Sequence, residues 1–206
     1  RVDRRQRQMC IRDRNNSGGL TMDVTGAENY CSILVIEPSP VEENVIWVGT
    51  DDGKVQFTNN GGDSWVDVSD NIKGLPKGSW ITQIKASKKN KGEALLVAND
   101  YRRYNYEPYA YRTTNYGKSW KRIVDESDVF GYTLCIVEDH IESKLMFLGT
   151  DDGLYVSIDS GNYWSKWKNK FPTVSVTDLM IHPIEHDLVI GTFGRAAWIL
   201  DDIEPL

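Results

Sequence analysis

The sequence predicts an all-β fold, a partial β-propeller of about four blades, each a four-stranded antiparallel sheet. Three observations lead to this prediction. A turn motif that ends in Trp occurs three times, and its Trp65, Trp120 and Trp164 lie 55 and then 44 residues apart, which is the period of a four-stranded unit. An apolar run followed by Gly-Thr-Asp-Asp-Gly occurs twice, 100 residues apart. No segment has the period of a long amphipathic helix.

The Trp-terminated motif has side chains that fix a tight turn. Its Asp or Asn accepts hydrogen bonds from N–H groups of the same turn, its Gly takes a backbone conformation closed to other residues, and its Ser or Thr hydroxyl adds a local hydrogen bond. The Trp begins the next strand and is expected to pack back over the turn. Two copies use Asn, which cannot act as a general acid, so we assign the motif a structural role. The copies comprise Thr58, Asn60, Gly62 and Trp65; Thr113, Asn115, Gly117 and Trp120; and Ser157, Asp159, Gly161 and Trp164.

The second motif predicts a buried strand that ends in a hairpin turn. Residues 45–53 and 145–153 each contain four apolar residues followed by Gly-Thr-Asp-Asp-Gly. Asp-Gly favours a tight turn because the Gly tolerates a positive φ. Turn chemistry therefore accounts for Asp51, Asp52, Asp151 and Asp152.

Strand alternation and turn signals divide the chain into four predicted blades, 30–69, 79–124, 130–169 and 175–203. The last unit has no Trp-terminated turn and no clear fourth strand. We expect that strand to come from the other end of the chain, as in propellers whose ring is closed by hydrogen bonds between the two ends.

The first fourteen residues differ from the rest of the chain. Residues 1–14 contain six Arg and two Asp, and the run Met-Cys-Ile-Arg-Asp at 9–13 resembles a translated sequencing adapter. We therefore exclude 1–14 as a non-native N-terminal scar and assign 15–206 to the propeller fragment. The whole chain has a formal charge of −6, so without the +4 of residues 1–14 the remainder has −10. This acidity disfavours a nucleic-acid partner.

Two sequence features bear on the membrane and on redox chemistry. No apolar run reaches the roughly 18 residues that a transmembrane helix needs, so no membrane span is predicted, and no signal peptide is visible. Cys31 and Cys135 lie in apolar runs, and we interpret them as buried thiols.

The repeats and the closing stretch, Ile-Gly-Thr-Phe-Gly-Arg-Ala-Ala-Trp at 190–198, together resemble the sortilin-type propellers of bacteria, in which the Trp-terminated turn is called an Asp-box or BNR repeat. The family pattern Gly-Thr-His-Gly-Arg-Gly has Phe193 in place of the His here and Ala196 in place of the last Gly. The resemblance covers about 27–206 and implies the C-terminal part of a larger propeller, whose remaining blades are partners of this segment. It also implies an extracellular or periplasmic location.

Three functions remain open from the sequence: non-catalytic binding of a peptide, protein or glycan; a part of an Asp-box glycoside hydrolase, similar to sialidases or xyloglucanases; or a structural segment of a larger assembly. A glycosidase needs two carboxyl groups across the scissile bond, and no spacing marks such a pair. A sialidase-like set of Arg102, Arg103, Arg112 and Arg195 with the Tyr106–Glu107 pair is present but has no diagnostic spacing. We assign no catalytic residue.

The best binding candidate is a Tyr- and Arg-rich segment that interrupts the second blade between predicted strands 94–99 and 109–113. Loops often bind ligands, and Tyr and Arg dominate binding hot spots. The alternative is a loop that packs between blades, with Arg stacked on Tyr. The predicted binding residues are Asp100, Tyr101, Arg102, Arg103, Tyr104 and Tyr106, together with Arg195.

No cofactor and no metal site are expected. His140, His182 and His186 are too few and too scattered for a zinc site, and we interpret His182 and His186 as residues of a surface turn. No loop has the ladder of oxygen ligands typical of calcium.

Overall fold

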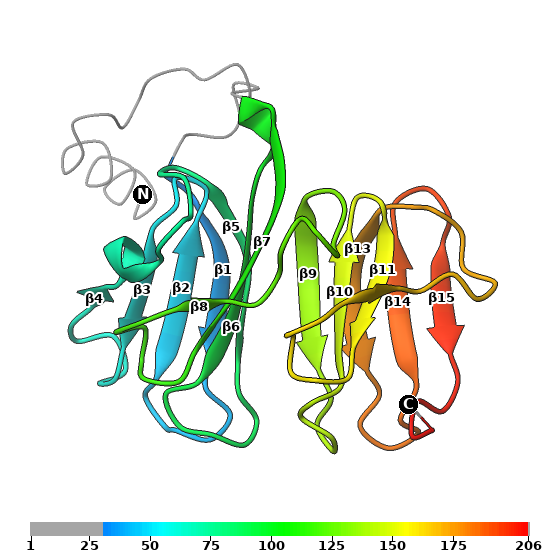
Figure 1. The fold of residues 1–206 in the computed structure, drawn as a ribbon. Coiled ribbons are helices and arrows are strands. Elements are labelled where there is room, and N and C mark those ends of the chain that lie inside the picture. The colour runs from blue at the N-terminus through cyan, green and yellow to red at the C-terminus, as the bar shows by residue number, and fades with distance from the viewer. Residues whose placement is uncertain (1–30, 206) are drawn as a thin grey trace, which may run out of the picture.

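The computed structural model describes residues 31–205; the segment 1–14 lies outside them. The described chain forms four antiparallel sheets in sequence order (Figure 1), so the predicted all-β, blade-like fold is confirmed. Short 3-10 turns occur at η1 (Ser69–Asn71) and η2 (Tyr101–Arg103). Within the described residues, none of the helices could span a membrane.

The first two blades each contain four strands in sequence order. Blade 1 consists of β1 (Ile33–Pro38), β2 (Ile46–Thr50), β3 (Val55–Thr58) and β4 (Val66–Asp67). Blade 2 consists of β5 (Trp80–Ala86), β6 (Ala94–Asp100), β7 (Asn105–Thr113) and β8 (Lys121–Arg122).

The last two blades repeat this order, and the described part of blade 4 has three strands. Blade 3 consists of β9 (Thr133–Glu138), β10 (Met146–Thr150), β11 (Gly153–Ser157) and β12 (Ser165–Lys166). Blade 4 consists of β13 (Val176–Ile181), β14 (Leu188–Thr192) and β15 (Ala197–Leu200).

Each interface between successive blades is a hydrophobic core. Blades 1 and 2 enclose Trp47, Phe57 and Trp120, blades 2 and 3 enclose Trp164, and blades 3 and 4 enclose Phe147. The Asp-box Trp of blades 2 and 3 thus packs against the preceding blade: Trp164 is 1% exposed and donates from Nε1 to the Ile123 carbonyl at 2.7 Å. Trp65 of blade 1 is 43% exposed, because within residues 31–205 its face of blade 1 meets no other sheet.

The first Gly of each Gly-Thr-Asp-Asp-Gly motif lets the next blade approach closely. A Cβ on Gly49 would lie 2.5 Å from Cγ2 of Ile81 in β5, and a Cβ on Gly149 would lie 2.7 Å from Cγ1 of Val176 in β13. Real Cβ atoms are not found this near other atoms, so these positions exclude a side chain and the motif sets the spacing between blades.

The first strand of each blade forms the inner edge of its sheet, and side chains of the preceding blade satisfy some of its backbone groups. Glu37 of β1 accepts from the Ala86 N–H at 3.3 Å. Gln83 of β5 accepts from the Ile136 N–H of β9 at 2.7 Å, and Thr82 donates to the Leu134 carbonyl at 3.2 Å. The inner strands of successive blades also contact one another, and the last residues of all four line one cavity, so these strands run in the same direction around a common axis.

The three Asp-box turns are held by the same side-chain hydrogen bonds. In the first, Thr58 donates to Asn60 Oδ1 at 2.7 Å, the Gly62 N–H donates to the Thr58 hydroxyl at 3.0 Å, and the Ser64 N–H donates to Asn60 Oδ1 at 3.0 Å. The second and third turns repeat these bonds with Thr113 and Asn115, and with Ser157 and Asp159.

Blade 4 ends differently because it has no Asp-box. In blades 1 to 3 a carbonyl of the loop between the first two strands accepts an N–H of the Asp-box turn: Asn44 from Gly61, Gly92 from Tyr116, and Lys144 from Ser160. In blade 4 the equivalent carbonyl of His186 accepts the N–H of Ile203 at 3.1 Å. Ile203 is fully buried, so the segment after β15 takes the place of the missing turn.

Candidate functional site

The predicted Tyr/Arg segment is the tip of a long hairpin rather than a loop between shorter strands. β6 extends to Asp100 and β7 begins at Asn105, with η2 between them, and the tip projects beyond the other blades at one end of the molecule (Figure 1). The segment lies between two strands of blade 2, as predicted, but the predicted start of the second strand at 109 is wrong, because β7 begins at Asn105 and the pairing continues through Asp100–Asn105 past a bulge. Pro108 lies in that bulge, where its missing N–H breaks no ladder bond.

Part of the hairpin packs between blades. The ring of Tyr101 stacks on Tyr132, which precedes β9, with centroids 4.6 Å apart and planes at 22°. The Arg102 guanidinium lies over the ring of Trp80 at the start of β5 and near Tyr101. Tyr101 and Arg102 therefore fill the packing role considered as the alternative. Arg103 forms an ion pair with Asp100 within the turn.

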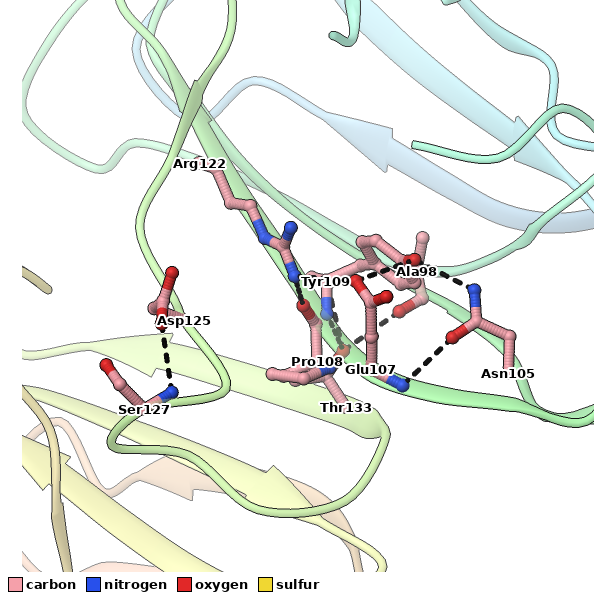
Figure 2. A network of polar contacts seen from close by, with 9 residues as sticks. All are labelled: Ala98, Asn105, Glu107, Pro108, Tyr109, Arg122, Asp125, Ser127 and Thr133. Carbon is pink, nitrogen blue, oxygen red and sulfur yellow. Dashed lines mark hydrogen bonds and ion pairs between the residues drawn. The ribbon is translucent and has the colours of Figure 1, made fainter. Parts of the chain in front are cut away.

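A polar network fixes the base of the hairpin against blade 3 (Figure 2). The buried Thr133 hydroxyl lies 2.8 Å from the Ala98 carbonyl and accepts the Tyr109 N–H at 3.0 Å, so it joins β6, β7 and β9. The Tyr109 hydroxyl accepts from Asn105 at 2.9 Å and donates to Glu107 at 3.2 Å. Burial is the largest contribution that raises the pKa of Tyr109 above its usual value, so this phenol stays protonated and keeps its donor at neutral pH.

The outer side of the hairpin presents two tyrosines to solvent. Tyr104 adopts the left-handed conformation, with φ of 61°, and is 77% exposed, while Tyr106 is 54% exposed. Tyr106 also lies 6.3 Å from the ring of Tyr132. A rigid base that carries exposed aromatic rings is suited to contact with a flat ligand surface.

Arg195, the last predicted binding residue, lies in the turn between β14 and β15 and is exposed. Because the inner strands share one direction, this turn and the β6–β7 hairpin are at the same end of the blades. The Arg195 carbonyl accepts from Trp198 Nε1 at 3.0 Å, which fixes the backbone of the turn but not the guanidinium. The structure does not bring Arg195 into contact with the hairpin residues through any bond that it records within 31–205.

A pocket of about 360 Å³ lies at the opposite end, where the four inner strands finish. Its walls combine charged groups, among them Glu37, Lys85 and Glu138, with apolar residues such as Val137 and Met180. Burial raises the pKa of Glu37, although Lys85 opposes the shift. Sequence reasoning missed this pocket, since its residues come from four blades.

The same end joins two histidines that the sequence analysis treated as scattered. His186 is 5% exposed, so its assignment to a surface turn is wrong, and its Nε2 lies 2.8 Å from Asp139 Oδ1. His140 Nδ1 lies 3.4 Å from the same oxygen. Burial opposes ionisation of Asp139, but hydrogen bonds from Glu142, His186 and Ile141 outweigh it and hold the pKa of Asp139 below its usual value.

The two described carboxyl groups whose pKa is raised do not form a glycosidase pair with each other. Burial raises the pKa of Glu37 and of Asp151, as a general acid would require. Glu37 is at the pocket end of β1, whereas Asp151 follows β10 at the hairpin end. Two carboxyls on opposite ends cannot act across one glycosidic bond.

Comparison with known proteins agrees with this architecture. Residues 108–198 match the family model for Sortilin, neurotensin receptor 3 (Sortilin-Vps10), and no curated protein matches the chain. Among solved structures, the GH74 xyloglucanase from Xanthomonas campestris has a TM-score of 0.61 and 14% identity over 82% of this chain and 29% of its own. YCF48 bound to D1 peptide has a TM-score of 0.57 and 16% identity over 84% of this chain and 53% of its own.

A computationally designed protein, Ika4, matches 85% of this chain and 94% of its own with a TM-score of 0.56 and 12% identity. The chain spans 22%, 22% and 29% of the three GH74 enzymes that it matches. At these identities the structural likeness establishes the fold alone. The chain therefore has a β-propeller fold with Asp-box turns, and its residues 108–198 are similar to the family Sortilin, neurotensin receptor 3 (Sortilin-Vps10).

Proposed function

We propose that this chain is a non-catalytic binding segment of an exported, extracellular or periplasmic, sortilin-like propeller, and that it holds a peptide or protein ligand on the end that carries the β6–β7 hairpin. The exposure of Tyr104 and Tyr106 on a hairpin with a fixed base carries this proposal. Exposed Tyr rings supply large contact area at a small cost in side-chain entropy.

The charges around the two rings support a polar ligand backbone rather than an apolar surface. The carboxylate of Glu107 is about half exposed, near the Arg122 guanidinium at 3.5 Å, and the Arg103 side chain is also about half exposed. Aromatic anchors with an Arg neighbour are typical of protein-binding hot spots. Arg195 lies on the same end and is a candidate second contact for an extended ligand.

The alternative is that the parent propeller is an Asp-box glycoside hydrolase. The fold likeness to GH74 enzymes supports it only at the level of architecture. Among residues 31–205, the two carboxyl groups with raised pKa, Glu37 and Asp151, lie at opposite ends, so this alternative requires at least one further carboxyl group beside either of them.

The test is a binding screen of the full chain against a displayed library of extended peptides, with xyloglucan oligosaccharides as the glycan probe. We expect selected peptides to bind, and the double variant Tyr104→Ala, Tyr106→Ala to lower their affinity by about 30-fold or more, since even one hot-spot aromatic contributes about 2 kcal/mol. The matched control is Tyr163→Ala, a tyrosine that is 62% exposed in an Asp-box turn at the opposite end.

Equal affinity of the double variant and the Tyr163→Ala control would contradict the proposal. Retention of xyloglucan oligosaccharides with no peptide binding would replace it with the glycan alternative.

A further inference from the structure

The loops between the first two strands of the four blades share one geometry. Each begins with a residue whose side chain accepts N–H groups two or three positions later: Ser39, Ser87, Asp139 and His182. Each ends with the residue whose carbonyl accepts from the blade's closing segment: Asn44, Gly92, Lys144 and His186. Three of these four last positions, all except Lys144, have a positive φ.

Two positions depart from the equivalent positions of other blades. Ser39 and Ser87 satisfy the opening turn with a hydroxyl, whereas blade 3 uses the carboxylate of Asp139. Blades 1 and 2 place Asn44 and Gly92 at the left-handed position, whereas blade 4 places the large imidazole of His186 there, with φ of 57°. Both residues are compatible with the local turn, since His is among the non-glycine residues enriched at positive φ and Asp accepts N–H groups in turns, but they bring two further candidate ligands to the loops.

These departures converge at one point. The carboxylate of Asp139 is 1% exposed and faces both imidazoles, at 2.8 Å from His186 Nε2 and 3.4 Å from His140 Nδ1. The three candidate ligand atoms lie within 4.8 Å of one another. In a tetrahedral zinc site with bonds of about 2.0–2.1 Å, ligand atoms are separated by about 3.3 Å, so small side-chain shifts bring all three into coordination.

The geometry points to a metal site: we propose that Asp139, His140 and His186 bind one divalent transition-metal ion, with Zn²⁺ the best match, which joins the β9–β10 loop of blade 3 to the β13–β14 loop of blade 4. Two imidazoles and one carboxylate suit zinc, whereas calcium and magnesium prefer oxygen ligands alone.

Each of the two rings has one buried nitrogen without a hydrogen-bond partner among the described residues. His140 Nδ1 is buried and makes no hydrogen bond, and His186 Nδ1 is also buried without a hydrogen-bond partner among the described residues. His186 is therefore not fixed in one tautomer by a second contact, and its Nε2 lone pair becomes available once its proton moves to Nδ1.

The surroundings favour a site with one open position. Three protein ligands leave a fourth position of a tetrahedral ion for water or another ligand. Asp139 and His140 also line the 360 Å³ pocket, so this position is accessible to a small ligand in the pocket. The metal would also strengthen the contact between these two loops. In the other two blade pairs a hydrogen bond joins the corresponding loops: the Gly92 N–H donates to Glu42, and Lys89 donates to the Ile141 carbonyl.

The test is isothermal titration of the full chain with Zn²⁺ alone, beside Ca²⁺. The repeat itself supplies conservative variants: Asp139→Ser, the residue of blades 1 and 2, and His186→Asn, the residue of blade 1. His140→Ala is a third variant at a less buried position. His182→Ser is the matched control, because it removes the remaining histidine of the chain and a Ser hydroxyl can still accept the turn N–H groups.

We expect one Zn²⁺ per chain, no Ca²⁺ uptake, a rise in melting temperature with Zn²⁺, and a loss of affinity on the order of 100-fold or more in each of the three ligand variants, since even partners outside the coordination sphere contribute 10- to 100-fold. His182→Ser should bind as the original chain does. Absence of Zn²⁺ uptake by the original chain, or equal affinity in His140→Ala and His182→Ser, would overturn the proposal.

Discussion

Truncation of the Asp-box tryptophans should show which blades pack against a predecessor. Trp164 is 1% exposed, and its Nε1 donates to the Ile123 carbonyl across the interface with blade 2. Replacement of a fully buried Trp by Ala costs about 3–5 kcal/mol through lost apolar burial and the cavity left behind. We therefore expect Trp164→Ala to lower the free energy of unfolding by about 4 kcal/mol.

Trp65 occupies the same motif position but is 43% exposed. Its truncation leaves no enclosed cavity, and part of its surface is already hydrated, so Trp65→Ala should cost only about 1–2 kcal/mol. Urea denaturation followed by circular dichroism measures both values, and the midpoint should fall by roughly 2 M for Trp164→Ala. Equal losses in the two variants would refute the reasoning that each Asp-box Trp is buried by the preceding blade.

Two further predictions concern the blade interface and the turn. Gly149→Ala should destabilise the chain by about 1–3 kcal/mol, because its Cβ would lie 2.5 Å from Cys135 Sγ. Gly191→Ala in blade 4, where no atom is nearer than 3.4 Å, should change stability by less than about 0.5 kcal/mol in thermal unfolding. Similar effects of the two variants would contradict the close approach of blades 3 and 4 at Gly149. Hydrogen bonds from the Tyr163 N–H and Ser157 lower the pKa of Asp159, so its contribution is present above about pH 4 and lost as the pH falls below it. Asp159→Asn should flatten this acid loss and leave stability near pH 7 almost unchanged, because Asn60 and Asn115 make equivalent bonds; an unchanged acid profile of unfolding would contradict this.

The sequence predicted those parts of the fold that depend on neighbouring residues. The Asp-box turn is determined within a few residues, because Asn60 and Thr58 bond to N–H groups of their own turn. The apolar runs 45–48 and 145–148 predict buried strands before tight turns, and the structure extends those strands through Gly49 and Gly149. The close approach of the next blade to these two glycines depends on tertiary packing, and the local sequence pattern does not indicate it.

The hairpin of blade 2 was predicted only in part. The Tyr/Arg segment was correctly placed between two strands of the blade, but its strand extent was wrong, because Pro108 and the charged residues around it hide the β alternation. The bulge that accommodates Pro108 depends on the register of β6 against β7, which turn and propensity signals do not specify.

The His140 and His186 cluster could not be predicted from spacing. The two residues belong to different blades and meet only because the β9–β10 and β13–β14 loops lie beside each other. A signal was present in the repeat itself, since Asp139 occupies a position where blades 1 and 2 have Ser. Alignment of the loops with one another, rather than a search for ligand spacing, would have identified it.

The arrangement of blades around one axis is tested most directly by hydrogen exchange at the Ile136 amide. This N–H is on the inner edge strand β9 and bonds to the Gln83 side chain of blade 2 at 2.7 Å. We predict protection of Ile136 in the original chain and a loss of at least about tenfold in Gln83→Ala, with unchanged exchange at Leu148 in the interior of the same sheet. If Ile136 stays protected without Gln83, its partner is a neighbouring strand, the sheets are continuous rather than radial, and the account is contradicted.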